Sequence, residues 1–212
     1  MPTTLNTGRI DPKRPLVALT FDDGPSNYTT RILNTLQQNS GRVSFFVMGN
    51  KVEEHKSKIL RAVHMECEII CHAWDHTDLT KLSKRAITKQ LYDTIAAIAK
   101  VTGKVSLMYR PPYGNIDNKV IKVSRKLGLA IVNWSVDPKD WHTKDAGEVY
   151  NAIMNEVKGG DIVLCHDVHE HTATAMSKLI PDLIAKGYQL VTVSELMTHK
   201  YGTITPGRLY LS

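Results

Sequence analysis

The chain has 212 residues, of which 42% are hydrophobic and 23% charged, so it is long enough to bury the core of one globular domain. Lysine and arginine number 27 against 21 aspartates and glutamates, a net charge of +6, but they are scattered without a long run or interleaved aromatic residues, which argues against nucleic-acid binding. No stretch of the sequence has the length and apolar character of a membrane span.

Short apolar or β-branched runs alternate with amphipathic patterns along the whole chain, which indicates strands that alternate with helices. The expected strands are Leu16–Asp22, Arg42–Val47, Glu68–Cys71, Leu107–Arg110, Ala130–Val136, Asp161–His166 and Gln189–Ser194. The expected helices are Thr29–Gln38, Val52–Val63, Lys84–Val101, Asp117–Leu127, Ala146–Val157 and Ala173–Lys186. Gly128 suits the C-terminal cap of the helix before it. Such alternation predicts right-handed crossovers and a parallel sheet.

The positions of the polar residues favour a barrel over an open sheet. Each lies at or just after the C-terminal end of a different expected strand: Asp22 and Asp23, His72, Arg110, Asp137, and His166. In a (β/α) barrel these ends gather around one mouth, whereas an open doubly wound sheet does not readily bring five of them together. We therefore expect a distorted (β/α) barrel of about seven parallel strands over residues 16–200, with an N-terminal segment (1–15) and a surface-packed C-terminal tail (201–212).

The N-terminal segment is polar and lacks the apolar core of a signal peptide. This leaves two interpretations open: a cytoplasmic protein, or the catalytic domain of a secreted or cell-surface protein. The cysteines, Cys67, Cys71 and Cys165, are odd in number, which argues against a disulfide scaffold. We interpret them as small core residues, with a cysteine–zinc site as the alternative.

A metal site is predicted from two histidines and a pair of aspartates. His72 and His76 are four residues apart, a spacing that places both imidazoles on one face of a helical turn. Of the adjacent Asp22 and Asp23, one carboxylate can serve as third ligand and the other as a base. Two histidines and one carboxylate leave a coordination position open for water, as a hydrolytic metal requires. Zinc suits these ligands, and cobalt or nickel would fit them too.

Five short motifs in a fixed order make the chain resemble the polysaccharide deacetylases of the NodB-homology type, carbohydrate esterase family four. The resemblance covers roughly Leu16 to Met197. The motifs are TFDDGP at Thr20–Pro25, HxxxH at His72–His76, RPPYG at Arg110–Gly114, DPKDW at Asp137–Trp141 and LCH at Leu164–His166.

The resemblance implies a role for each of the main polar residues. Asp23 would bind the metal together with His72 and His76. Asp22 would be the general base, held in orientation by Arg110, and a protonated His166 would be the general acid.

The resemblance also implies an aspartate partner for the acid and a small pocket for the acetyl group. Asp137 is the first choice for the partner of His166, and Asp140 is the second. The Tyr113 backbone N–H would help to form an oxyanion hole on a loop stiffened by Pro112. Trp141 and Leu164 would form the walls around the acetyl methyl group.

One departure concerns Ala73, where the family usually carries a serine or threonine; we expect a working enzyme with weaker metal retention. The function predicted is the removal of acetyl groups from a polysaccharide or oligosaccharide by a monomeric enzyme. N-acetylglucosamine polymers such as chitin oligomers or peptidoglycan are favoured over acetyl xylan. The alternative is a cytosolic metal-dependent amidase that acts on a small amide or ureide. A non-catalytic glycan-binding module is disfavoured, because every residue of the expected machinery is present.

Overall fold

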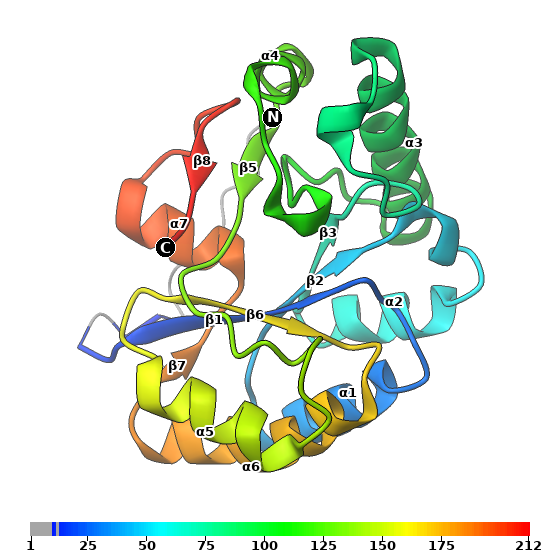
Figure 1. Cartoon of the computed structure of the whole chain (residues 1–212). Helices are drawn as coiled ribbons and strands as arrows, with labels where there is room; N and C mark the ends of the chain where they lie inside the picture. The colour runs from blue at the N-terminus through cyan, green and yellow to red at the C-terminus, as the bar shows by residue number, and fades with distance from the viewer. Residues whose placement is uncertain (1–9, 12) are drawn as a thin grey trace.

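The computed structural model describes residues 10–11 and 13–212. All strand pairings are parallel, in the order β6-β1-β2-β3-β4-β5-β8, with β7 paired to the start of β1. The strands are β1 (Leu16–Asp22), β2 (Ser44–Val47), β3 (Glu68–Cys71), β4 (Met108–Tyr109), β5 (Ala130–Val132), β6 (Ile162–His166), β7 (Gln189–Leu190) and β8 (Leu209–Tyr210). Figure 1 shows the curved sheet with helices around it. The expected distorted (β/α) barrel is confirmed.

Helices connect successive strands, as the alternating pattern predicted. They are α1 (Thr29–Asn39), α2 (Lys56–His64), α3 (Lys84–Thr102), α4 (Asn118–Leu127), α5 (Ala146–Glu156), α6 (Glu170–Ala185) and α7 (Val193–Tyr201), with short 3-10 turns η2 (Gly49–Lys51), η3 (Leu79–Lys81) and η4 (Pro112–Gly114). Gly128 caps α4 with a left-handed backbone, φ 75°, as expected. No helix within the described part of the chain is both long and apolar enough to cross a lipid bilayer.

The ring of strands closes through an irregular segment and not through a named strand. Val163 of β6 pairs with Leu19 of β1 on one edge. On the other edge it pairs with Val136, in the segment that follows β5, through an isolated parallel bridge. Backbone hydrogen bonds from Val136 to Ile162 and from Leu164 to Val136 hold this closure together.

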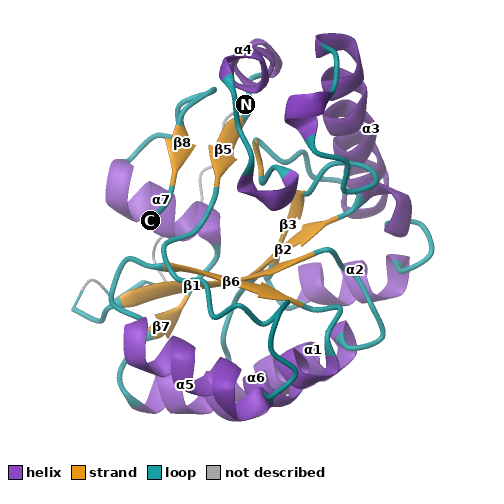
Figure 2. Ribbon diagram, viewed as in Figure 1, coloured by secondary structure: helices purple, strands orange, loops and turns teal. Residues whose placement is uncertain are grey.

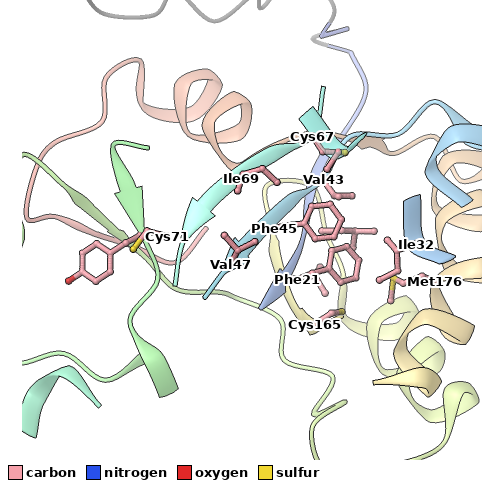
Figure 3. Close-up of a cluster of buried hydrophobic side chains, with 14 of the residues drawn as sticks. Phe21, Ile32, Val43, Phe45, Val47, Cys67, Ile69, Cys71, Cys165 and Met176 are labelled. Atoms are coloured by element: carbon pink, nitrogen blue, oxygen red, sulfur yellow. The ribbon is translucent and has the colours of Figure 1, made fainter. Parts of the chain in front are cut away.

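Two apolar clusters lie on opposite faces of the strands, because successive side chains of a strand alternate between faces. Phe45 belongs to the cluster between the sheet and the outer helices, where its ring stacks on Phe21 at 5.3 Å (Figure 3). Phe46 belongs to the second cluster, which Leu196 and Met197 of α7 help to fill. Burying a side chain of this size stabilises the fold by roughly 1.5–3 kcal/mol. The three cysteines are free and buried in the first cluster, so their interpretation as core residues is confirmed.

The C-terminal part differs from the expectation. The predicted strand over residues 189–194 ends at Leu190, and α7 begins at Val193 after a capping box between Thr192 and Glu195. The tail was expected to pack on the surface, and most of it is exposed or partly exposed, but residues 209–210 differ: they form β8 beside β5, with Tyr210 buried. Of the N-terminal segment, residues 1–9 and 12 lie outside the described part.

Candidate active site

The C-terminal ends of the strands bring the predicted polar residues together. Asp22 is the last residue of β1 and His166 the last residue of β6, and the two are direct partners in the parallel register. His72 follows β3 and Arg110 follows β4 immediately. The barrel mouth lies where these strands end (Figure 2).

Asp23, His72 and His76 form a compact set of three donors. Asp23 Oδ1 lies 3.3 Å from His72 Nε2 and 3.2 Å from His76 Nε2. The same oxygen is buried and accepts no hydrogen bond from the residues that the structure describes. A buried carboxylate oxygen without a hydrogen-bond donor is costly unless a cation or a proton satisfies it. The donor set therefore fits one divalent metal ion with an open position.

The loop that carries the two histidines is not helical, so the predicted helical turn was wrong. Ala73 and His76 have left-handed backbones, φ 60° and 63°. The loop is held from α3 instead: Gln90 accepts a hydrogen bond from the Trp74 backbone N–H and donates one to Asp75. These contacts fix the loop in a chain that lacks a hydroxyl at position 73.

The ring orientation of His72 is set by a backbone carbonyl. His72 Nδ1 lies 2.9 Å from the carbonyl oxygen of Arg110, which can only accept, so Nδ1 carries the proton. The lone pair of Nε2 is thereby free for a metal. Burial by itself raises the pKa of Asp23, but its contact with His72 and the nearby charge of His76 outweigh burial, and the pKa lies well below the ordinary value.

Arg110 holds the predicted base. The guanidinium is fully buried, and Nη1 lies 2.6 Å from Asp22 Oδ1 and 2.8 Å from Thr20 Oγ1. Nε and Nη2 donate to the carbonyl oxygens of Val132 and Asn133. Because its donors are spread over strands from different parts of the chain, the side chain fixes the Asp22 carboxylate in one orientation.

His166 pairs with Asp140, so the first choice of Asp137 was wrong. His166 Nδ1 lies 2.7 Å from Asp140 Oδ1, and the His166 backbone N–H donates to Oδ2 of the same carboxylate. Asp137 instead accepts a hydrogen bond from the Lys139 backbone and caps that turn. Burial lowers the pKa of His166, but Asp140 and the nearby Asp22 outweigh burial and raise it to about 9.

Two residues at the start of α6 hold Asp140 in place, and the sequence analysis did not identify them. Thr172 Oγ1 donates to Asp140 Oδ2 at 2.7 Å, and His171 Nε2 lies 2.7 Å from the Asp140 carbonyl oxygen. The histidine ring therefore donates to that carbonyl. Both residues follow His166 closely in sequence, which is the signal that could have drawn attention to them.

The loop after β4 places Tyr113 beside the metal ligands. Pro112 is buried and begins η4, and Tyr113 has a left-handed backbone, φ 61°. Its ring is 63% exposed and meets the His76 ring edge-on at 4.5 Å. A Cβ at Gly114 would lie 2.8 Å from the Trp134 ring, so glycine is required there.

The two predicted walls of the acetyl pocket differ in exposure. Leu164 is buried and lies two residues before His166 on β6, so both side chains point to the same face of the strand. Trp141 is 56% exposed and its ring lies against His142. The structure thus places Leu164 on the face of the acid, while the indole ring is open to solvent.

Comparison with known proteins decides the family. The polysaccharide deacetylase family model matches residues 9–132, more than half of the chain. The chain belongs to the polysaccharide deacetylase family. It is 32% identical over 206 residues to a peptidoglycan N-acetylglucosamine deacetylase of Bacillus cereus, and the match covers 94% of this chain and 96% of that relative.

Other relatives are longer than this chain or have solved structures. The peptidoglycan N-acetylmuramic acid deacetylase PdaC of Bacillus subtilis is 37% identical over 188 residues; the match covers 88% of this chain and spans 40% of the relative's length. A family 4 acetyl xylan esterase from Clostridium thermocellum, solved in complex with a cobalt ion, superimposes with a TM-score of 0.86 at 35% identity. That superposition covers 93% of this chain and 98% of the esterase.

A further buried carboxylate, which the sequence analysis missed, supports the loop of Asp23. Asp167 follows His166, accepts a hydrogen bond from the Thr29 hydroxyl, and packs against Gly24, where an added Cβ would lie 2.1 Å from its Oδ1. Burial raises the pKa of Asp167 to about 7. Its place directly after the acid in the sequence was the available signal.

Proposed function

We propose that the protein is a metal-dependent hydrolase that removes acetyl groups from an N-acetylated polysaccharide. One observation carries the proposal: Asp22 and His166 are register partners at the mouth, beside the donor set of Asp23, His72 and His76. A carboxylate base and a protonated imidazole on either side of an open metal site are the groups that hydrolytic acyl transfer requires.

Asp23, His72 and His76 would hold the metal. When bound, a divalent ion supplies Lewis acidity toward a carbonyl oxygen and toward water. Zinc is our first choice, because two imidazoles and one carboxylate are ligands that zinc accepts, and cobalt and nickel accept the same set. The cobalt ion in the related acetyl xylan esterase is consistent with this range.

The chain's own residues divide the proton transfers between them. Asp22, oriented by Arg110, accepts the proton of the attacking water. His166, kept protonated by Asp140, donates a proton to the leaving nitrogen or oxygen as the tetrahedral intermediate collapses. We assign the Tyr113 backbone N–H to the developing oxyanion, and Leu164, Pro112 and Trp141 to the surroundings of the acetyl group.

The protonated acid favours amides over esters. An amine must be protonated before its C–N bond breaks, whereas an alkoxide leaves more readily and depends less on an acid. With a pKa of about 9, His166 carries its proton at neutral pH. We therefore infer that N-acetylated polymers are preferred to acetyl xylan. Since several relatives are named for peptidoglycan, we further propose peptidoglycan as the polymer and a cell-surface or secreted location for a monomeric enzyme.

The test measures acetate released from N-acetylglucosamine oligomers, peptidoglycan and acetyl xylan by the metal-loaded protein. His166→Ala serves as the matched variant. We expect the wild type to favour the two N-acetylated substrates, and the variant to lose far more activity on them than on the ester. A wild type that cleaves only acetyl xylan would refute the amide preference. One that cleaves only small amides or ureides would replace the proposal with the amidase alternative.

A further inference from the structure

A second pocket lies outside the mouth, between α3 and α4, which Figure 1 shows side by side. Four of the residues that line this pocket are cationic and exposed. Two of them belong to the first turn of α3 and two to successive turns of α4. We call this pocket the cationic pocket. These residues are Lys84, Arg85, Lys122 and Lys126. Thr88 and Val123 complete the lining.

The four cations lack acidic partners, in contrast to their neighbours. On the same two helices, Lys89 pairs with Asp93 at 2.5 Å and Lys119 pairs with Asp117 at 3.9 Å. Within residues 10–11 and 13–212, none of the four residues of the cationic pocket forms an ion pair. Like charges that converge on one hollow repel one another, and an anion bound between them relieves that repulsion.

The cationic pocket lies close to a hollow at the mouth, on the side of His76. A shallow pocket beside the metal ligands is lined by His76, Tyr113 and Lys81, among others. Lys81 ends η3 three residues before Lys84, and three residues of chain span at most about 11 Å. Lys119 Nζ donates to the Thr80 carbonyl oxygen at 2.8 Å, which fastens α4 to η3. A polymer that leaves the mouth past Tyr113 therefore passes next to the cationic pocket.

We propose that the cationic pocket binds carboxylates on the peptide branches of the substrate glycan, and so selects a peptide-bearing, anionic N-acetylated polymer. The inference rests on the proposed function. Because the cationic pocket lies close to the hollow at the mouth, its anions are most simply carried by the substrate strand itself. Peptidoglycan strands carry carboxylates on their peptides, whereas chitin oligomers are neutral. Arg85 can pair with a carboxylate through two hydrogen bonds, and the lysines add positive charge around it.

The test compares a double charge reversal in the pocket with the same change elsewhere. Lys84→Glu/Lys122→Glu alters the cationic pocket. Lys104→Glu/Lys158→Glu is the control, since Lys104 lies between α3 and β4 and Lys158 lies between α5 and β6, both at the end of the barrel opposite the mouth. Neither pair belongs to the catalytic machinery. Three substrates are used: peptidoglycan strands with free peptide carboxylates, the same strands after their carboxylates have been converted to amides, and N-acetylglucosamine oligomers.

We expect the pocket variant to lose about tenfold in kcat/KM on the strands with free peptide carboxylates, mainly through KM, because each exposed ion pair contributes modestly. Its activity on the two uncharged substrates, and the activity of the control variant on all three, should stay at the wild-type level. Added salt should raise the wild-type KM only for the strands with free peptide carboxylates. Equal effects of the reversal on all substrates, or no effect on any, would overturn the proposal.

Binding without turnover separates this proposal from the proposed function. If the wild type releases no acetate from any substrate, the deacetylase assignment fails. Co-sedimentation with insoluble peptide-bearing strands then still tests the pocket, since only the pocket variant should bind less. The strands are compared with and without an attached glycerol phosphate polymer. Binding that requires the attached phosphate polymer, and persists after the peptide carboxylates are converted to amides, would overturn the assignment to peptide carboxylates.

Discussion

Replacing Asp140 by asparagine should move the basic limb of the pH–activity profile to lower pH. His166 acts as an acid only while protonated, and its pKa is about 9 compared with an ordinary value of 6.5. That difference corresponds to about 3 kcal/mol in favour of the charged ring, and the 2.7 Å contact with Asp140 is its main source. Without the Asp140 carboxylate, only more distant charges oppose the lowering of the His166 pKa by burial. The pKa of His166 should then return to about 6.5 or below.

The size of the effect depends on pH in a way that a general loss of structure would not reproduce. At pH 8, about nine-tenths of His166 is protonated in the wild type and about 3% in Asp140→Asn, so kcat/KM should fall about 30-fold from protonation alone. At pH 6 the loss from protonation alone should be only about 1.3-fold. The assay is kcat/KM on N-acetylglucosamine oligomers from pH 5 to pH 10. Asp137→Asn is the matched control, because Asp137 contacts the Lys139 backbone and not the acid. A basic limb that stays near pH 9 in Asp140→Asn would refute the reasoning.

Five further changes test the site and its support. A chelator should abolish acetate release and added zinc or cobalt should restore it; full activity in protein verified as metal-free would rule out the three-donor site. Asp22→Asn should keep its metal while kcat falls by about two to four orders of magnitude, whereas Asp23→Asn should lose metal; elemental analysis that gives the reverse pattern would exchange their roles. Arg110→Met leaves the buried Asp22 carboxylate unpaired and should lower the free energy of unfolding by about 3–5 kcal/mol in denaturant titrations, so an unchanged midpoint contradicts the proposed pairing. Gly24→Ala places a Cβ 2.1 Å from Asp167 Oδ1 and should lower Tm. A Tm equal to that of the wild type would show that the Asp167 side chain can move away without loss of stability.

The fold and the set of site residues could be predicted because they depend on local patterns. The alternation of short apolar runs with amphipathic patterns predicts the parallel barrel. Residues at the C-terminal ends of its strands must then meet at the mouth. The conformation of the His72–His76 loop could not be predicted in this way. A spacing of four suits a helix, but the left-handed backbone at Ala73 brings the same two rings together in a loop.

Other features depend on contacts between distant segments. Asp137 and Asp140 are three residues apart in one loop, and only the packing of α6 through Thr172 decides which of them faces the acid. The strand at residues 209–210 is too short to show an alternating apolar pattern in the sequence. It forms because the free edge of β5 supplies its hydrogen-bond partners. By contrast, α7 had a local signal in the capping box that starts at Thr192, which the sequence analysis passed over.

Arg110 serves the base and the metal site through two different parts of the same residue. Its guanidinium fixes Asp22, and its backbone carbonyl fixes His72. Side-chain replacement can remove only the first contact, since every amino acid at this position brings the same carbonyl. A mutational scan of Arg110 will therefore report only the loss of its contact with the Asp22 carboxylate. The hydrogen bond from His72 to the backbone carbonyl of residue 110 will not be detected by side-chain substitution. Replacing the peptide bond itself by semisynthesis, with a group that weakens this one acceptor, would reveal the second contribution.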